Sequence, residues 1–389
     1  MRKLVIFRTI LTILILLGIT VVLYIYTSGY RLKKDTNNKI DFTKTGMVSA
    51  KSIPEGATVY LDGNLATATN DTISGVEPGT HNLKIFKKGF VEWKKDIEVY
   101  KELVTDITAV LISQSPRLEP LTNTGAKSLN ISPSLTKLTY FSKDETEPGV
   151  WVIPLSGGGL SLFRTTPTVV LKDTKTTKYS NADTIQWSPD EKQLLVSGTA
   201  PSAKNNIYYL VDINTNTAQT TTTPNLILKQ WDQTLTQKRT DAIAKLDIPE
   251  SIKQIALASK TVWSPDEKKF LYTVQNGNSL EYRVYNLEKP IPVGEKVENL
   301  VFTTAAKDPQ PRITWYADSF HLILVEGDVM KNGRGVISLI RIDGTNKTEV
   351  YNNTLYSDLV FSSPGGDKLI ILTSFKSGGQ TDLYTVSIR

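Results

Sequence analysis

Apolar residues are distributed differently in the first 30 residues and in the rest of the chain. Residues 4–26 are almost entirely apolar, and Arg8 is their only charged residue. The 18 uncharged residues from 9 to 26 approach the roughly 20 that a helix needs to cross a bilayer core. Farther along, short runs of β-forming residues recur, and many alternate between apolar and polar positions with the period of a strand. The pattern predicts one N-terminal helix followed by a mainly β protein.

The apolar segment fits either a transmembrane anchor or a cleaved signal peptide. Its run is longer than a typical signal-peptide core, and the following "TSGYRLKK" lacks a small-x-small cleavage site. Tyr24, Tyr26 and Tyr30 stand where an interfacial aromatic belt would lie. We therefore expect residues 1–30 to be an uncleaved, single-pass anchor in the cytoplasmic membrane. Basic residues flank it on both sides, so only the short N-terminal tail favours an N-terminus inside the cell and extracytoplasmic C-terminal domains.

One eight-residue motif recurs almost unchanged, as "WSPDEKQL" at 187–194 and "WSPDEKKF" at 263–270. Three degenerate copies keep an apolar residue, a turn and a β-like run. The five copies begin 46 to 76 residues apart, at Ile131, Trp187, Trp263, Trp315 and Phe361. An all-strand repeat of this length is typical of propeller blades. The pattern predicts a β-propeller over residues 115–389 with five blades, or six if one degenerate blade escapes detection.

Two segments depart from this repeat. Residues 226–258 lack strand alternation and keep apolar residues at helical spacing, so we expect a helical insertion there. The last repeat has only three strand-like segments, whereas residues 115–123 form an unassigned one before the first blade. Because a propeller must close its ring, residues 115–123 are expected to pair with the last blade and complete it.

A shorter β region precedes the repeats, after a polar linker at 31–46. In "ATVYLDGNL", alternating residues lead into Asp62-Gly63, a pair that supplies the positive φ angles of a tight hairpin. "EPGTHNLKIF" repeats the scheme, with Pro78-Gly79 as its turn. Together with the tetrapeptide Pro54-Glu55-Gly56-Ala57 and the "KKGF" turn, this order resembles the PEGA domain over residues 47–112. The resemblance implies a small β-sandwich of extracytoplasmic proteins, which binds or spaces and does not catalyse.

The repeats carry a second resemblance. "WSPDEK" is similar to the turn of TolB-like and WD-repeat propellers, with Glu191 and Glu267 where that class usually has Gly. The resemblance implies an architecture and not an activity, because propellers serve many functions.

The repeated acids could form a site, but they also have a structural explanation. In Pro189-Asp190 and Pro265-Asp266, Pro fixes φ for a turn and Asp can accept hydrogen bonds from nearby backbone amides. An acidic site would instead require these carboxylates and Asp318 to converge from three blades. We interpret them as turn residues.

The repeated aromatic residues and Glu55 also have two interpretations. Trp187, Trp263, Trp315 and Phe361 are expected in the core between blades, with stacking on a ligand as the alternative. Glu55 is interpreted as a turn carboxylate before the first strand of the small domain, with a ligand contact as the alternative.

Composition and charge narrow the possible functions. The chain has no cysteine, which excludes disulfides, thiol catalysis and thiolate metal sites, and it has only two histidines. With no nucleophile motif and no calcium loop, we expect no catalytic residue, no cofactor and no metal. The net charge of +6 lies entirely in residues 1–45, so the neutral remainder offers no basic face to nucleic acid.

These features together predict a membrane-anchored, extracytoplasmic binding or scaffolding protein of the cell envelope, with a protein or glycan partner. One alternative is an enzyme acting on envelope polysaccharide through carboxylates at the propeller mouth. Another is a purely structural spacer or a sensor ectodomain.

Overall fold

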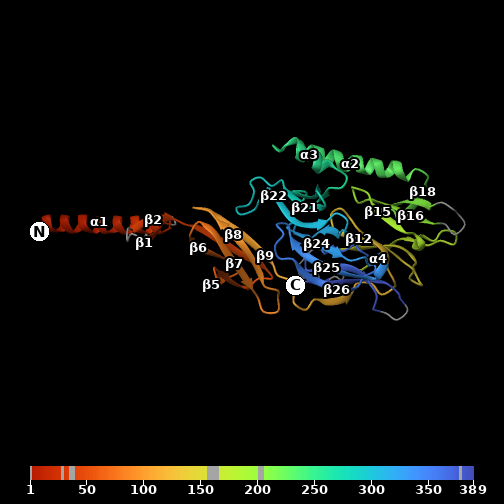
Figure 1. Cartoon of the computed structure of the whole chain (residues 1–389), viewed down its shortest axis with the longest axis horizontal. Coiled ribbons are helices and arrows are strands. Elements are labelled where there is room, and N and C mark those ends of the chain that lie inside the picture. Colours follow the sequence, from red (N-terminus) through yellow and green to blue (C-terminus); the bar gives the residue numbers. More distant parts are fainter. Residues whose placement is uncertain (1, 28–29, 35–39, 156–165, 200–205, 376–378) are drawn as a thin grey trace. The chain divides into compact units, whose positions relative to one another are not determined.

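The computed structural model describes residues 2–27, 30–34, 40–155, 166–199, 206–375 and 379–389. These form two compact units (Figure 1). The first contains residues 1–111 and 290–295, and the second contains residues 112–289 and 296–389.

The first unit begins with helix α1, Arg2–Thr27. Its apolar window Phe7–Tyr24 has a mean hydropathy of 2.2 and is entirely exposed, so by length and composition this helix can cross a membrane. A signal sequence passes the same test.

A two-stranded hairpin follows α1 where the sequence predicts only a linker. Strand β1, Tyr30–Lys34, pairs antiparallel with β2, Ile40–Lys44, and the register sets Tyr30 opposite Lys44. Two five-residue strands are too short for a clear alternating pattern, which explains why the sequence did not predict them.

The rest of the first unit is a β-sandwich. One sheet has the order β6-β3-β9 and the other β5-β4-β7-β8. Alternate residues of both sheets point inward, and the buried cluster includes Val48, Val59, Leu83, Ile85 and Ile107. The strands are β3 Gly46–Ile53, β4 Thr58–Leu61, β5 Asn64–Ala68, β6 Asp71–Val76, β7 Gly79–Phe86, β8 Trp93–Val99 and β9 Val104–Val110.

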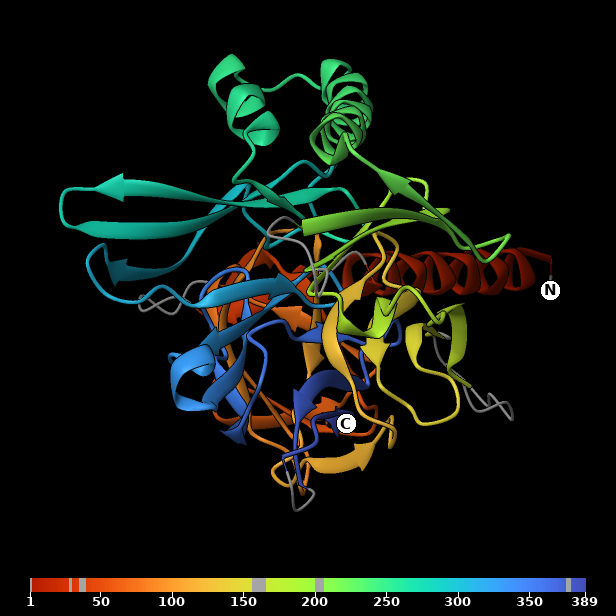
Figure 2. The same ribbon diagram turned by 90° about the vertical axis from the view of Figure 1, so that its right-hand side faces the viewer.

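The described residues of the second unit form five four-stranded antiparallel sheets, arranged around a common centre in Figure 2. We call them blades 1 to 5. Blade 1 is β11 Lys127–Ile131, β12 Lys137–Ser142, β13 Gly149–Pro154 and β14 Thr168–Lys172. Blade 2 is β15 Thr184–Trp187, β16 Gln193–Thr199, β17 Asn206–Asp212 and β18 Thr217–Thr221. Blade 3 is β19 Val262–Trp263, β20 Lys269–Asn276, β21 Ser279–Asn286 and β22 Glu298–Ala305. Blade 4 is β23 Arg312–Trp315, β24 His321–Glu326, β25 Arg334–Arg341 and β26 Thr348–Thr354.

Blade 5 confirms the predicted ring closure. Its strands β27 Phe361–Ser362, β28 Lys368–Thr373 and β29 Asp382–Ser387 are completed by β10, Arg117–Pro120, from the start of the unit. Strand β10 pairs antiparallel with β29, and Arg117 lies opposite Ser387. The two ends of the propeller sequence are therefore held in one sheet.

Apolar clusters join neighbouring blades. One includes Phe141 and Val150 of blade 1 with Leu194 and Val196 of blade 2. A second joins blades 3 and 4, and a third joins blade 5 to blade 1.

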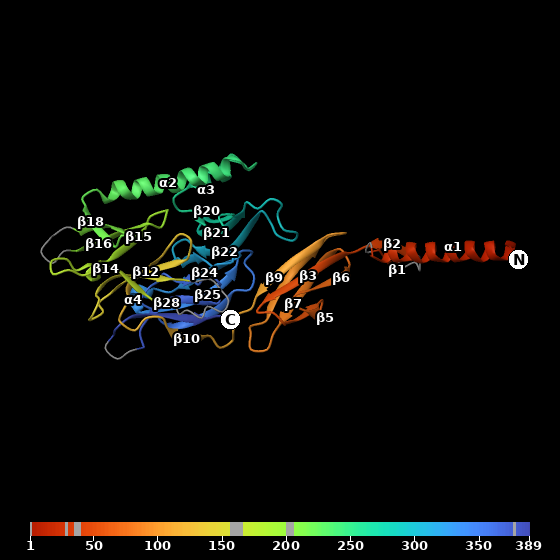
Figure 3. The same ribbon diagram turned by 180° about the vertical axis from the view of Figure 1, so that it is seen from behind.

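The predicted helical insertion is present as α2, Pro224–Ala244, and α3, Glu250–Leu257. Figures 2 and 3 both show the two helices on the outside of blades 2 and 3. Ile243 of α2 and Ala256 of α3 join a buried cluster with Phe270, Tyr272 and Tyr285 of blade 3. The helices therefore cover an aromatic face of blade 3.

Candidate functional site

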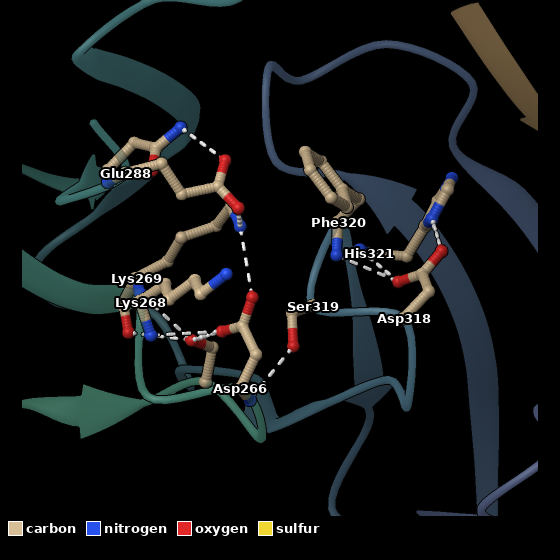
Figure 4. Close-up of polar contacts among 10 residues, drawn as sticks. Asp266, Lys268, Lys269, Glu288, Asp318, Ser319, Phe320 and His321 are labelled. Atoms are coloured by element: carbon tan, nitrogen blue, oxygen red, sulfur yellow. Dashed lines mark hydrogen bonds and ion pairs between the residues drawn. The ribbon is translucent and has the colours of Figure 1, made fainter. Parts of the chain in front are cut away.

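Each blade has two ends, which differ in what they present. We define the upper face as the end at which the first strand of each blade begins, and the lower face as the end that carries the repeated turn. Figure 4 shows the lower-face residues of blades 3 and 4.

The acids of the repeated turn each bind within their own turn. Oδ1 of Asp190 accepts hydrogen bonds from the Ser188 hydroxyl at 2.6 Å and the Lys192 amide at 3.3 Å. Oδ1 of Asp266 accepts from the Ser264 hydroxyl at 2.5 Å and the Lys268 amide at 3.0 Å.

Asp318 follows the same scheme, because its Oδ1 accepts from the amides of Phe320 and His321 at 2.8 and 3.0 Å. Its Oδ2 lies 2.7 Å from Nδ1 of His321 (Figure 4). Burial opposes ionisation of Asp318, but the contacts with His321 and the two amides outweigh it and lower the pKa. These carboxylates therefore serve three separate turns.

The turn position that TolB-like and WD-repeat propellers usually fill with glycine has a positive φ angle in this protein. Glu191 has φ 57° and Glu267 has φ 56°, and Gly366 holds the equivalent position of blade 5 at 64°. Only glycine, asparagine and aspartate adopt this region readily, so the two glutamates carry some backbone strain. Their side chains compensate in part: Glu191 accepts from the Ser134 amide at 2.5 Å, and Glu267 pairs with Lys238 of α2 at 2.7 Å.

A buried cation joins the turns of blades 3 and 4. Lys269 has no exposed surface, and its Nζ lies 3.2 Å from both Asp266 and Glu288. The same Nζ lies 4.1 Å from the centre of the Phe320 ring on the next blade (Figure 4). Burial opposes ionisation of Asp266, but the Ser264 and Lys268 hydrogen bonds and the charge of Lys269 lower its pKa. The buried ammonium of Lys269 therefore lies between two carboxylates, which fits a structural role.

Three of the four repeated aromatic residues lie between blades as predicted, whereas Trp263 packs between blade 3 and the helical insertion, which covers this face of the blade. Trp187, Trp315 and Phe361 are at most 9% exposed and belong to three different inter-blade clusters. Trp263 is partly buried, and its indole donates to the Ala256 carbonyl of α3 at 2.9 Å. The indole of Trp315 donates to the Val262 carbonyl of blade 3 at 2.9 Å. The prolines of the motif, Pro189 and Pro265, lie in the turns that follow these residues.

In the sandwich, the tetrapeptide Pro54-Glu55-Gly56-Ala57 connects β3 to β4. Ala57 is buried in the core, and Gly56 has φ 75°. The backbone carbonyls of Glu55 and Gly56 accept from Nζ of Lys87 at 2.6 and 3.3 Å. The Glu55 side chain is exposed and lines a cavity of about 540 Å³. This cavity is also lined by Ser49, Lys51, Ser52, Ile53, Pro54, Asn70, Asp71, Thr72 and Thr108.

The Asp62-Gly63 turn is tied to strand β7 through His81. Both turn residues have positive φ, 50° and 79°, as the sequence predicts. Asp62 accepts from the Asn82 amide at 2.9 Å and lies 2.6 Å from Nδ1 of His81, while Nε2 of His81 lies 2.7 Å from the Glu77 carbonyl. Because both partners of the ring are acceptors, the two bonds together require the protonated imidazolium.

The pKa values of this pair agree with that requirement. Burial opposes protonation of His81, but the bonds to Asp62 and Glu77 outweigh it, so its pKa is raised. The His81 and Asn82 hydrogen bonds lower the pKa of Asp62. Pro78-Gly79 forms the connection just before His81, with Gly79 at φ 135°.

The upper face contains a pocket of about 320 Å³ at the seam where the ring closes. Its lining comes from the segment before β11, the end of β12, the segment of η1 (Tyr179–Asn181) and the β28–β29 connection. The lining residues are Thr124, Gly125, Ala126, Lys127, Phe141, Lys143, Ser180, Gly379, Gln380 and Thr381. The two charged members are both lysines. Lys127 pairs with Asp183 at 2.7 Å, whereas Lys143 is exposed and makes no ion pair with any described residue.

A buried carboxylate fixes the wall of this pocket. Asp382 is 1% exposed, and its Oδ1 accepts from the Thr122 hydroxyl at 3.0 Å and the Gly125 amide at 2.9 Å. Its Oδ2 accepts from Nε2 of Gln380 at 2.9 Å. The pocket and the ring closure therefore depend on the same residues.

Large apolar side chains are exposed around the upper ends of blades 4 and 5. Phe375, which follows β28, is 54% exposed, and Tyr356, which follows β26, is 42% exposed. The Tyr356 amide donates to the Leu372 carbonyl at 2.9 Å, so the two segments are adjacent. Met330 in helix α4, Val329–Asn332, is 79% exposed. Among the described residues, no group of three His, Cys, Asp or Glu side chains could hold a metal ion.

The sequence did not reveal this upper-face pocket. Its residues come from both ends of the propeller sequence, and no periodic pattern marks them. One sequence feature could have pointed to this face: Phe375 is a large aromatic residue that follows a strand-like segment instead of lying within it, and loops often carry binding residues.

Comparison with known proteins identifies the small domain. No relative among curated protein sequences matches the chain. Among solved structures, it is similar to TolB from Acinetobacter baumannii, with 14% identity and a TM-score of 0.26, over 85% of this chain and 63% of that chain. The chain thus spans less than two thirds of that protein.

Two further solved structures are similar at the same level. A chain of the mitotic checkpoint complex has 11% identity and a TM-score of 0.35, over 71% of this chain and 93% of that one. An oligogalacturonate lyase from Vibrio parahaemolyticus has 9% identity and a TM-score of 0.32, over 80% and 86%. The blade count rests on strand pairing and not on these likenesses.

The PEGA domain family matches residues 45–114, which cover the whole β-sandwich. The chain therefore carries a PEGA domain at residues 45–114, between an N-terminal apolar helix and a propeller of five four-stranded sheets.

Proposed function

We propose that this protein is a non-catalytic binding or scaffolding protein of the cell envelope, anchored in the cytoplasmic membrane by α1. Its N-terminus lies inside the cell, and the PEGA domain and the propeller lie outside. The upper face of the propeller binds a protein or glycan partner.

The observation that carries this proposal is the composition of the upper face. It combines a pocket of mixed polar and apolar lining with Lys143, which is exposed and has no ion pair with a described residue, and with exposed aromatic side chains at Tyr356 and Phe375. Aromatic residues beside adaptable polar groups are typical of binding surfaces. The acids Asp190, Asp266 and Asp318 are instead engaged within their own turns, which supports a non-catalytic role.

Membrane fractionation tests the anchor. We expect the full chain in the membrane fraction, released by detergent but not by high salt, and a variant lacking residues 1–30 in the soluble fraction. Recovery of a soluble species that is intact from Thr27 onward would show that α1 is not an anchor.

Site-specific photo-crosslinking in intact cells tests the binding surface. A crosslinking residue at Phe375 should give a discrete adduct, and Lys143→Glu should reduce its yield several-fold. Leu118, which is 37% exposed on the outer strand of the same blade, is the matched control position. Equal adducts from positions 375 and 118, or no effect of Lys143→Glu, would contradict binding at the upper face.

A further inference from the structure

The PEGA domain exposes apolar side chains at one end. The connection between β8 and β9, residues 100–103, contains Tyr100 at 45% and Leu103 at 47% exposure, and Val104 at the start of β9 is 41% exposed. Met47 on the neighbouring strand β3 is 38% exposed. We call these four residues the apolar end of the domain.

The apolar end is bonded directly to the residues by which the chain enters the domain. The Met47 amide donates to the Leu103 carbonyl at 3.0 Å, and the Glu102 amide donates to the Thr45 carbonyl at 3.0 Å. Met47 also lies opposite Val104 in the parallel β3–β9 pair. A Cβ at the buried Gly46 would lie 2.3 Å from the Tyr100 carbonyl oxygen, so only glycine permits this close approach.

The hairpin β1–β2 keeps this entry point near the end of α1. Helix α1 ends at Thr27, and Tyr30 lies opposite Lys44 in the hairpin. Tyr30 is three residues after Thr27, and its cross-strand partner Lys44 is followed directly by Thr45. The sum of these steps places Thr45 within about 20 Å of Thr27, whatever direction the hairpin takes. The same segment fully extended would reach about 60 Å. Because the hairpin folds the chain back on itself, Thr45 lies close to the end of α1 instead of far from it.

The position of α1 in a bilayer then places the apolar end near the lipid headgroups. If Phe7–Tyr24 occupies the hydrocarbon core, Thr27 is only three residues beyond it, about 4.5 Å along a helix. The headgroup layer on each side is about 5–8 Å thick. A domain bonded to Thr45 is therefore held within reach of that layer.

The chemistry of the apolar end fits a lipid surface. Tyrosine is enriched at membrane interfaces, where its ring is buried and its hydroxyl stays hydrated. Leu103 and Val104 add aliphatic surface, and the exposed Lys101 beside them suits anionic headgroups. Glu102, the one acid of the loop, is paired with Lys44 at 2.8 Å.

We propose that Met47, Tyr100, Leu103 and Val104 insert into the headgroup layer of the bilayer that α1 crosses. This gives the PEGA domain a second attachment to the membrane, which sets its orientation. The inference rests on the membrane anchor of the proposed function.

Single-cysteine labelling of the full chain tests it, because the natural chain contains no cysteine. A polarity-sensitive fluorophore is attached at Leu103→Cys, at Leu14→Cys within α1, and at Phe86→Cys as the matched control. Phe86 is 42% exposed at the opposite end of β7 from the pair Gly79–Val99. Each labelled chain is reconstituted in vesicles of phosphatidylcholine, with or without phosphatidylglycerol, that carry a quencher at the headgroup or in the mid-chain.

The expected pattern distinguishes the two proposals. The Leu14 probe should be quenched from the mid-chain, and the Leu103 probe should shift to the blue and be quenched from the headgroup, while the Phe86 probe does neither. If the Leu14 probe is quenched but the Leu103 probe behaves like the Phe86 probe, the insertion is wrong and the anchor stands. If the Leu14 probe is not quenched, the anchor is wrong as well.

A second variant separates lipid contact from other contacts. Tyr100→Asp combined with Val104→Asp should abolish the blue shift of a probe at Met47→Cys and leave the Leu14 probe unchanged. A shift that persists in detergent without lipid and grows with protein concentration would instead assign the apolar end to contact between copies of the chain.

Discussion

At the scale of single residues, the polar groups of this protein are mostly engaged in closing turns. Asp190, Asp266 and Asp318 accept hydrogen bonds from the amides of their own turns. In the PEGA domain, Asp62 instead ties its hairpin turn to β7, because it accepts from the Asn82 amide and contacts His81. The strength of the His81 bridge changes with protonation, because both partners of its ring are acceptors.

We predict that His81 makes the β4–β7 region of the PEGA domain more stable at mildly acidic pH. The raised pKa of His81 means that its contribution is complete below the unfolded pKa of about 6.5 and is lost as pH rises through the folded pKa. The lowered pKa of Asp62 means that its contribution is present above about pH 3.9 and is lost as pH falls through the folded pKa. The pair should therefore stabilise most between about pH 4 and 6.5.

Amide hydrogen exchange of the full chain, corrected for intrinsic rates, measures this effect. Peptides covering residues 62–83 should be better protected at pH 6 than at pH 8, and His81→Gln should remove the difference. His321→Gln in the propeller is the matched control and should leave these peptides unchanged. A pH difference that survives His81→Gln would assign it to another group.

Residue chemistry also explains how much of the molecule the sequence could reveal. The sequence predicted the repeated turn because its Pro, its Asp and its positive-φ position act locally. It predicted the closure of blade 5 because counting the strand-like segments left one unassigned, which is β10. The Asp62-Gly63 hairpin was predictable because its turn residues also act locally. The upper-face pocket was not, because Lys143 and Gln380 meet only when residues far apart in the chain come together.

At the scale of elements, the helical insertion covers the aromatic face of blade 3. On blade 3, Phe270 stacks on Tyr285 with ring centres 5.5 Å apart and lies tilted against Tyr272 at 5.8 Å. Ile243 of α2 and Ala256 of α3 pack against these rings. The insertion is thus part of the propeller core and not an appendage on its surface.

We predict that Ile243→Ala lowers the free energy of unfolding of the propeller by about 2–4 kcal/mol. Ile243 is 2% exposed, so the change leaves a cavity against the rings of blade 3. Leu226→Ala on the same helix is the control; Leu226 is 53% exposed, and its truncation should cost less than about 0.5 kcal/mol. Urea unfolding followed by tryptophan fluorescence measures both. Equal effects of the two changes would mean that the helices do not contribute to the core.

At the scale of the whole molecule, one short strand and one buried carboxylate contribute to closing the ring, beside the apolar cluster that joins blade 5 to blade 1. Strand β10 adds four residues of pairing to blade 5, which is a small contact to hold the start of the propeller sequence against its end. Asp382 strengthens this seam by accepting from Thr122 and Gly125 on the incoming segment. Asp382 lies 257 positions from Gly125 and 260 from Thr122 in the sequence. Bringing such distant residues together costs chain entropy, and the hydrogen bonds of this carboxylate help to offset that cost.

We predict that Asp382→Ala lowers the free energy of unfolding of the propeller by about 2–4 kcal/mol, because three donors lose a buried acceptor at once. The control is Asp367→Ala in the lower turn of the same blade, where an exposed carboxylate accepts from the Ser363 hydroxyl at 2.6 Å and removal should cost less than about 1 kcal/mol. In amide hydrogen exchange, the loss of protection should be confined to β10 and β29, which lie at opposite ends of the propeller sequence. If protection falls only in β29 and β10 is unaffected, the carboxylate stabilises its own strand and does not contribute to closing the ring.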